Sequence, residues 1–165
     1  MTVATKPALK VADEVWICTA LLHRENPGQA DFSIEEIMER VNREALGGRL
    51  RPGVYVHVVQ HCVANRAPNP GRYRMLFESG AGRRRLFRTG DCYHPNREDS
   101  KITPSAEDLP AGYGGLLEWY KEWCVERQTT APATDPLLLL AGSGKGLWAE
   151  EKADEYVRRL REGWE

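Results

Sequence analysis

The sequence predicts an α+β fold that is mainly α-helical, with a small β-hairpin and a helical tail. Three observations support this class. Apolar residues recur with helical spacing in several segments, two short alternating runs flank a glycine loop, and a stretch rich in threonine and proline precedes the last helical segment. We therefore expect a domain over residues 1–127, a linker over residues 128–136 and a helical tail over residues 137–165.

The first two elements are expected to be helices. Residues 10–22 repeat apolar side chains at helical spacing, which predicts an amphipathic helix. A second helix is expected to begin at Ser33, because Ser33 and Glu36 have the spacing of a capping box. We expect this second helix to stop at Gly47-Gly48.

The third element combines strand-forming residues with a helical pattern. Val54 and Val56 favour a strand, whereas Pro52 at a start position and the longer-range spacing favour a helix to about Asn65. One face of this helix is apolar, and its members are Tyr55, Val58, Val59, Cys62 and Val63. The opposite face is small and polar, without carboxylates, and its members are His57, Gln60, His61, Ala64 and Asn65. We expect the apolar face to be buried and the polar face to be exposed.

Two short runs, residues 72–78 and 83–88, flank the glycine loop 79–82 and predict a β-hairpin. The hairpin holds a single acid, Glu78, beside Arg72, Arg74, Arg83, Arg84, Arg85 and Arg88. We expect its tip and outer face to contact phosphates without internal neutralisation. A further helix over residues 115–127 carries an aromatic stripe and is expected to close the core.

The order helix, helix, helix, basic hairpin is that of a winged helix-turn-helix domain. In such domains the third helix enters the major groove of duplex DNA and the wing contacts the backbone or minor groove. Amide and imidazole groups both donate and accept hydrogen bonds at base edges, so the candidate base-contacting residues are His57, Gln60, His61 and Asn65. The candidate phosphate-contacting residues are Arg49, Arg51, Arg72, Arg74, Arg83, Arg84 and Arg85.

Charge is segregated along the chain. The 165 residues have a net charge of −1, yet residues 40–97 hold 12 basic and 3 acidic residues, an excess of +9. Such a block favours a polyanionic partner, although the pI of the whole chain is about 6.4. The alternative is that the arginines pair with acidic groups from the flanking segments.

The composition limits the class of protein. With 41% hydrophobic and 28% charged residues, the chain is typical of globular proteins rather than of fibrous or membrane proteins. Its longest purely apolar run, residues 137–141, is far shorter than the roughly 20 residues of a membrane-spanning helix. The four cysteines form no CxxC pair, which favours reduced thiols. We expect a cytoplasmic protein without membrane contact.

Three motifs give residues 9–125 a resemblance to an uncharacterised family of bacterial winged-helix-like domains. They are Phe-Ser-Ile-Glu-Glu-Ile at 32–37, Gly-Arg-Tyr at 71–73 and Leu-Glu-Trp-Tyr at 117–120. The resemblance implies the fold and names no ligand.

The tail carries motifs of its own, among them Asp-Pro-Leu-Leu at 135–138, Gly-Ser-Gly at 142–144 and Tyr-Val-Arg-Arg-Leu-Arg at 156–161. They resemble the toxin-binding segment of bacterial antitoxins that neutralise PIN-domain ribonucleases. In that family the tail wraps the toxin, with apolar side chains in a groove and a basic residue aimed at the acidic metal site. The apolar anchors implied here are Leu147, Trp148, Tyr156, Val157, Leu160 and Trp164. The basic residues implied are Arg158, Arg159 and Arg161.

Three hypotheses follow from the sequence. The first is a DNA-binding transcription regulator, not an enzyme, which acts as an antitoxin and represses its own operon; it needs no cofactor, and a homodimer would suit palindromic sites. The second is a winged-helix module that binds protein instead of DNA. The third is a metal-dependent nuclease built on His57 and His61, which lie one helical turn apart. Its further candidate ligands are Cys62, Cys92 and His94, although Cys62 is expected on the buried face.

Overall fold

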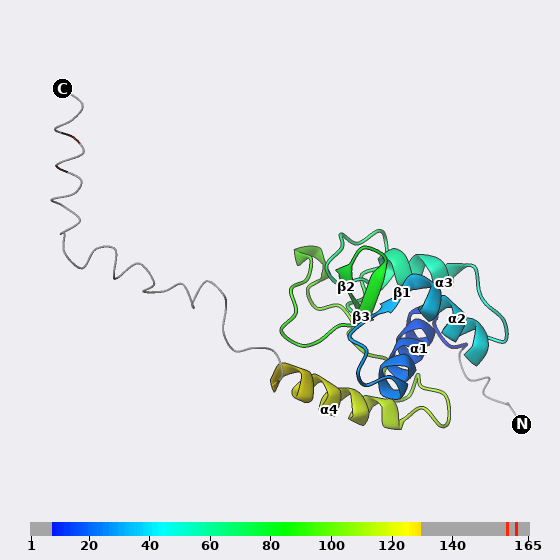
Figure 1. Ribbon diagram of the computed structural model, residues 1–165. Helices are drawn as coiled ribbons and strands as arrows, with labels where there is room; N and C mark the ends of the chain where they lie inside the picture. Colours follow the sequence, from blue (N-terminus) through cyan, green and yellow to red (C-terminus); the bar gives the residue numbers. More distant parts are fainter. Residues whose placement is uncertain (1–7, 130–157, 159–160, 162–165) are drawn as a thin grey trace, which may run out of the picture. The chain divides into compact units, whose positions relative to one another are not determined.

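The computed structural model describes residues 8–129 together with Arg158 and Arg161 (Figure 1). The chain divides into two units, Met1–Val125 and Glu126–Glu165. The described elements, in chain order, are α1 (Val11–Glu25), β1 (Phe32–Ser33), α2 (Ile34–Glu44), α3 (Gly53–Val56), the π-helix η1 (His57–His61), β2 (Leu76–Gly80), β3 (Arg83–Leu86), the 3₁₀ turn η2 (Pro95–Arg97) and α4 (Gly115–Thr129). The fold is therefore α+β and mainly helical, as the sequence predicts. No helix among residues 8–129 has the length and apolar character needed to cross a lipid bilayer.

The three strands form one small antiparallel sheet in the order β1-β3-β2 (Figure 1). Phe32 pairs with Arg84 and Leu76 pairs with Leu86, so the strand between α1 and α2 extends the hairpin. The glycine loop connects β2 and β3, and Gly82 takes a positive φ of 66° there. The paired part of the hairpin is shorter than predicted, because β2 begins at Leu76 rather than at residue 72.

The first helix, α1, is the centre of the core. It packs against α2, α3, η1 and β3, and even its polar residues Asp13, Glu14 and His23 are buried. The prediction of an amphipathic helix is therefore wrong for α1. The carboxylates are tolerated inside because Lys101 pairs with Asp13 and Arg51 pairs with Glu14.

The capping box at the start of α2 is confirmed. The Ser33 hydroxyl accepts a hydrogen bond from the backbone N–H of Glu36 at 3.1 Å, and the Glu36 carboxylate accepts one from the N–H of Ser33 at 2.6 Å. The helix ends earlier than predicted, because Ala45 adopts a left-handed conformation with φ of 48°.

The third element is helical, but its faces differ from the prediction. An α-helical turn, α3, continues as the π-helix η1, which ends at His61 rather than near Asn65. Ala64, which was assigned to the polar exposed face, is buried, whereas Tyr55, assigned to the buried face, is exposed. The buried stripe consists of Val54 and Val58 within the helix and of Cys62 directly after it. The wider π turn displaces the faces from regular α-helical spacing.

The aromatic stripe of α4 covers the core as predicted. Leu116, Tyr120 and Trp123 are buried, and the rings of Tyr120 and Trp16 meet edge to face with centroids 5.5 Å apart. This contact joins α4 directly to the central helix α1.

Candidate nucleic-acid interface

The segment that leads into α3 is held against α1 by one buried carboxylate. Glu14 accepts hydrogen bonds from the Gly47 N–H at 3.0 Å and from the Arg51 Nε at 3.0 Å, and Arg51 also donates to the carbonyl of Leu9 at 2.7 Å. The Glu14 side chain is only 1% exposed. The structure thus gives Arg51 a structural role before the start of α3.

The two amide side chains expected to contact bases are bonded to the protein backbone. Asn65 accepts from the Glu78 N–H at 2.9 Å and donates to the Glu78 carbonyl at 3.0 Å, so its amide completes the edge of β2. Gln60 donates to the carbonyl of Ala67. These bonds position the segment after η1, and they use one N–H and one oxygen lone pair of the Asn65 amide.

His57 and His61 lie together on one side of η1. Their rings meet edge to face with centroids 4.9 Å apart, and the Nδ1 of His57 is 2.8 Å from the carbonyl oxygen of Gly53. Burial lowers the pKa of His61, and the nearby His57 and Arg97 act in the same direction. A Cβ on Gly71 would lie 2.7 Å from the Cβ of His61, so only glycine allows the chain to pass so close to this ring.

Arg97 is a positioning residue that the sequence analysis missed. Its side chain is fully buried, and it donates to the carbonyl oxygens of His61 at 2.8 Å, Gln60 at 2.8 Å, Tyr73 at 2.7 Å and Arg66 at 2.6 Å. Burial lowers the pKa of this guanidinium. A single cation therefore joins carbonyls at the C-terminal end of η1 to those of Arg66 and Tyr73. The only signal in the sequence was the turn-forming Pro95 just before it.

The expectation that the hairpin arginines are not neutralised internally is wrong for Arg83, Arg84 and Arg85. Arg83 pairs with Asp31 at 2.6 Å, and Arg85 pairs with Asp91 at 2.6 Å. Arg84 is 1% exposed; it pairs with Glu78 and donates to the carbonyl of Val58 at 3.2 Å. The buried guanidinium of Arg84 therefore fastens β3 to η1 instead of facing solvent.

Of the remaining candidate arginines, Arg74 is stacked on an aromatic ring, whereas Arg49 and Arg72 are exposed. Arg74 lies 4.4 Å from the centroid of the Tyr93 ring and donates to the Ser100 carbonyl at 3.3 Å. Arg49 and Arg72 are exposed, and neither has an ion pair or a hydrogen-bonded side chain within residues 8–129. Of the seven predicted phosphate-contacting residues, Arg49 and Arg72 are thus the two with free guanidinium groups.

Three apolar side chains are exposed in or just before α3. Tyr55 is 55% exposed, Val56 is 42% exposed and Leu50, which precedes α3, is 39% exposed. Arg49 precedes these residues in the chain, and Arg72 follows Gly71, which packs on His61 at the end of η1.

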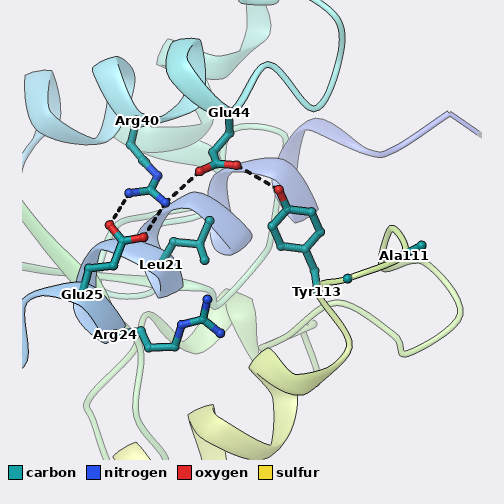
Figure 2. Close-up of a pocket in the computed structure, with 8 residues that line it drawn as sticks. Leu21, Arg24, Glu25, Arg40, Glu44, Ala111 and Tyr113 are labelled. Carbon is teal, nitrogen blue, oxygen red and sulfur yellow. Dashed lines mark hydrogen bonds and ion pairs between the residues drawn. The ribbon is translucent and has the colours of Figure 1, made fainter.

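A separate cavity of about 430 Å³ lies between the ends of α1 and α2 and the segment before α4 (Figure 2). Figure 2 shows Arg40 between the carboxylates of Glu25 and Glu44, and the Tyr113 hydroxyl donates to Glu44 at 2.9 Å. The hydrogen bond from Arg40 lowers the pKa of Glu25, while burial and the Glu44 carboxylate raise the pKa of Tyr113. The basic and acidic side chains that line the cavity neutralise one another. The network therefore joins the three segments, and the cavity has no excess charge that would favour an anionic or a cationic ligand.

A metal-dependent nuclease would need a third ligand beside His57 and His61. Within the described part of the chain, no three His, Cys, Asp or Glu side chains are grouped so that they could hold a metal ion. Cys62 is buried, while Cys92 is exposed.

Most of the tail residues implied by the antitoxin resemblance lie outside the described residues. These are Leu147, Trp148, Tyr156, Val157, Arg159, Leu160 and Trp164. Arg158 and Arg161 are described, and both are helical and exposed.

Comparison of the chain with family models, with curated proteins and with solved structures finds no significant match.

Proposed function

We propose that residues 8–125 are a winged-helix domain that binds duplex DNA, and that the chain is a transcription regulator whose tail binds and blocks a ribonuclease toxin. The observation that carries the DNA-binding half is the strand order β1-β3-β2, in which the short strand before α2 extends the hairpin. A strand between the first two helices that extends the hairpin is the arrangement expected of a winged helix. The bond from Arg84 to the Val58 carbonyl holds the hairpin and the helix in fixed relation.

The number of phosphate contacts is smaller than the charge of the basic block suggests. Arg51, Arg83, Arg84 and Arg85 are paired within the domain and Arg74 is stacked on Tyr93, which leaves Arg49 and Arg72 among the seven candidates. Each phosphate contact contributes about −0.9 to the slope of log affinity against log salt, so two contacts give about −1.8 per bound chain.

The DNA-binding half is tested by fluorescence anisotropy of the full chain on a mixed-sequence duplex across a salt series. We expect a slope of about −1.8 for the natural chain and a slope near zero for the Arg49→Ala, Arg72→Ala double variant. Lys121→Ala, which removes an exposed cation from α4, is the matched control and should keep the natural slope. Equal slopes for the natural chain and the double variant would refute these two contacts.

The tail half rests on the antitoxin resemblance and on the chemistry of the residues. Aromatic anchors supply much of the energy of a small interface, and a guanidinium pairs with the clustered carboxylates of a nuclease site. We expect Trp148→Ala, Leu160→Ala to abolish co-purification with a co-expressed PIN-domain ribonuclease while leaving DNA binding intact. Undiminished co-purification of the double variant would exclude these residues as anchors.

A protein-binding winged helix is the second candidate. Two observations favour it: the arginines of β3 are paired internally, and the exposed residues of α3 are Tyr55 and Val56. Absence of salt-dependent binding to any duplex at low salt would select this candidate over DNA binding.

A further inference from the structure

We propose that the cavity between the ends of α1 and α2 and the segment before α4 binds a free α-amino acid in its zwitterionic form. The cavity has a volume of about 430 Å³, which is the size of a small-molecule site. Its position, away from α3 and the hairpin, makes this binding a further activity beside the DNA binding proposed above. The class of ligand follows from the charges that line the cavity and from which of them already have partners.

Two carboxylates at two helix ends form the negative side of the cavity. Glu25 is the last residue of α1, Glu44 is the last residue of α2, and both line the cavity. The C-terminal end of a helix carries a partial negative charge, so both helix ends favour a cation. Arg40 pairs with both carboxylates, and the three side chains together keep one net negative charge.

The two carboxylates can accept further hydrogen bonds. Glu25 accepts two hydrogen bonds from Arg40, while Glu44 pairs with Arg40 and accepts one hydrogen bond from the Tyr113 hydroxyl. A carboxylate has about four lone-pair sites, so each keeps sites for another donor. The side chains of Glu25 and Glu44 are 48% and 20% exposed, which lets a ligand ammonium reach them.

Arg24 supplies the positive side of the cavity. Its side chain lines the cavity and is exposed, and Figure 2 shows its guanidinium on the other side of Leu21 from Arg40. Among residues 8–129 this guanidinium has no hydrogen bond and no ion pair. Its planar set of N–H donors therefore remains available for a carboxylate, which a guanidinium binds through two parallel hydrogen bonds.

The two sides together favour a ligand that carries both charges. An anion bound to Arg24 would be repelled by the carboxylates of Glu25 and Glu44, and a cation bound to those carboxylates would be repelled by Arg24. An α-amino acid avoids both penalties, because its ammonium and its carboxylate are separated by a single carbon atom. We therefore place the ligand carboxylate at Arg24 and the ligand ammonium at the two helix ends.

Calorimetric titration of the full chain with each common α-amino acid tests the proposal. We expect at least one amino acid to bind and to shift the backbone amide signals of Gly112 and Tyr113, which line the cavity. Two derivatives of that amino acid test the two charges separately: the N-acetyl derivative lacks the ammonium, and the α-amide lacks the carboxylate. Each should bind at least about tenfold more weakly, which is the loss expected for one charge-assisted hydrogen bond.

Arg24→Gln tests where the ligand carboxylate lies. We expect this variant to bind the amino acid at least about tenfold more weakly and to bind the amino acid and its α-amide equally. Arg43→Gln is the matched control, because Arg43 is an exposed arginine in the last turn of α2 that does not line the cavity; it should keep the natural affinity.

Three results would overturn the proposal. They are the absence of binding by every amino acid, equal affinity for the amino acid and its N-acetyl derivative, and binding that leaves the Gly112 and Tyr113 signals unchanged. The salt slope on duplex DNA is measured separately and involves other arginines, so a failure of amino-acid binding is distinguishable from a failure of the proposed function.

Discussion

At the scale of single residues, the arginines of the basic block act mainly as internal braces. Arg97 illustrates this role, because it is fully buried and donates to the backbone carbonyls of four residues at 2.6–2.8 Å, with no carboxylate in ion-pair distance among residues 8–129. A guanidinium has five N–H donors in a fixed plane, which suits several converging carbonyls. Its positive charge also complements the negative end of the helix.

Replacement of Arg97 should therefore be costly. Arg97→Met removes the donors and leaves several carbonyls unpaired in the interior, so we expect the free energy of unfolding to fall by about 3 kcal/mol or more. Arg72→Met is the matched control, because Arg72 is exposed and has no side-chain partner; it should change stability by less than about 0.5 kcal/mol. Urea unfolding followed by tryptophan fluorescence measures both, and similar stability losses would contradict the role given to Arg97.

At the scale of elements, the sequence predicted those features of the helices that depend on residues close together in the chain. The capping box at Ser33 and the aromatic stripe of α4 depend on residues close in sequence, and both are found as expected. The prediction for the faces of the third helix is wrong, because a π turn breaks the regular α-helical spacing. No residue in this segment indicates a π turn from the sequence alone. The partners of Arg83 and Arg51 escaped prediction for another reason: Asp31 and Glu14 are dozens of residues away, and only the fold brings them together.

The cap of α2 offers a test at this scale. Ser33→Ala removes the acceptor for the Glu36 N–H, and we expect the free energy of unfolding to fall by about 1 kcal/mol. Glu35→Ala, which changes an exposed residue in the same turn, should have a smaller effect. A Ser33→Ala variant as stable as the natural chain in urea would show that the capping box contributes nothing.

At the scale of the whole domain, buried carboxylates of α1 connect segments that are distant in the chain. Asp13 pairs with Lys101 at 3.1 Å, and Glu14 pairs with Arg51. The two partners of the second pair differ in burial, since the Arg51 side chain is 26% exposed and that of Glu14 is 1% exposed. Loss of Arg51 and loss of Glu14 should therefore lower the free energy of unfolding by different amounts.

We expect Arg51→Met to destabilise the domain by about 3 kcal/mol, because it leaves an unpaired carboxylate in the interior. Glu14→Gln should cost about 1 kcal/mol, since the freed guanidinium is partly hydrated and the amide still accepts from Gly47. The combined variant shows whether the pair is coupled: its loss should be smaller than the sum of the two single losses. An additive double variant would mean that the two side chains act independently.

The pairing of the β3 arginines also affects how fast a partner would be found. A block of unpaired charge steers a polyanion over long distances and accelerates encounter, whereas carboxylates within 4 Å of Arg83, Arg84 and Arg85 cancel much of that field. Association with a duplex would then proceed near the unsteered rate, on the order of 10⁵–10⁶ M⁻¹ s⁻¹, and would depend only weakly on ionic strength. The chain would then distinguish one DNA site from another by the dissociation rate of each complex rather than by its association rate.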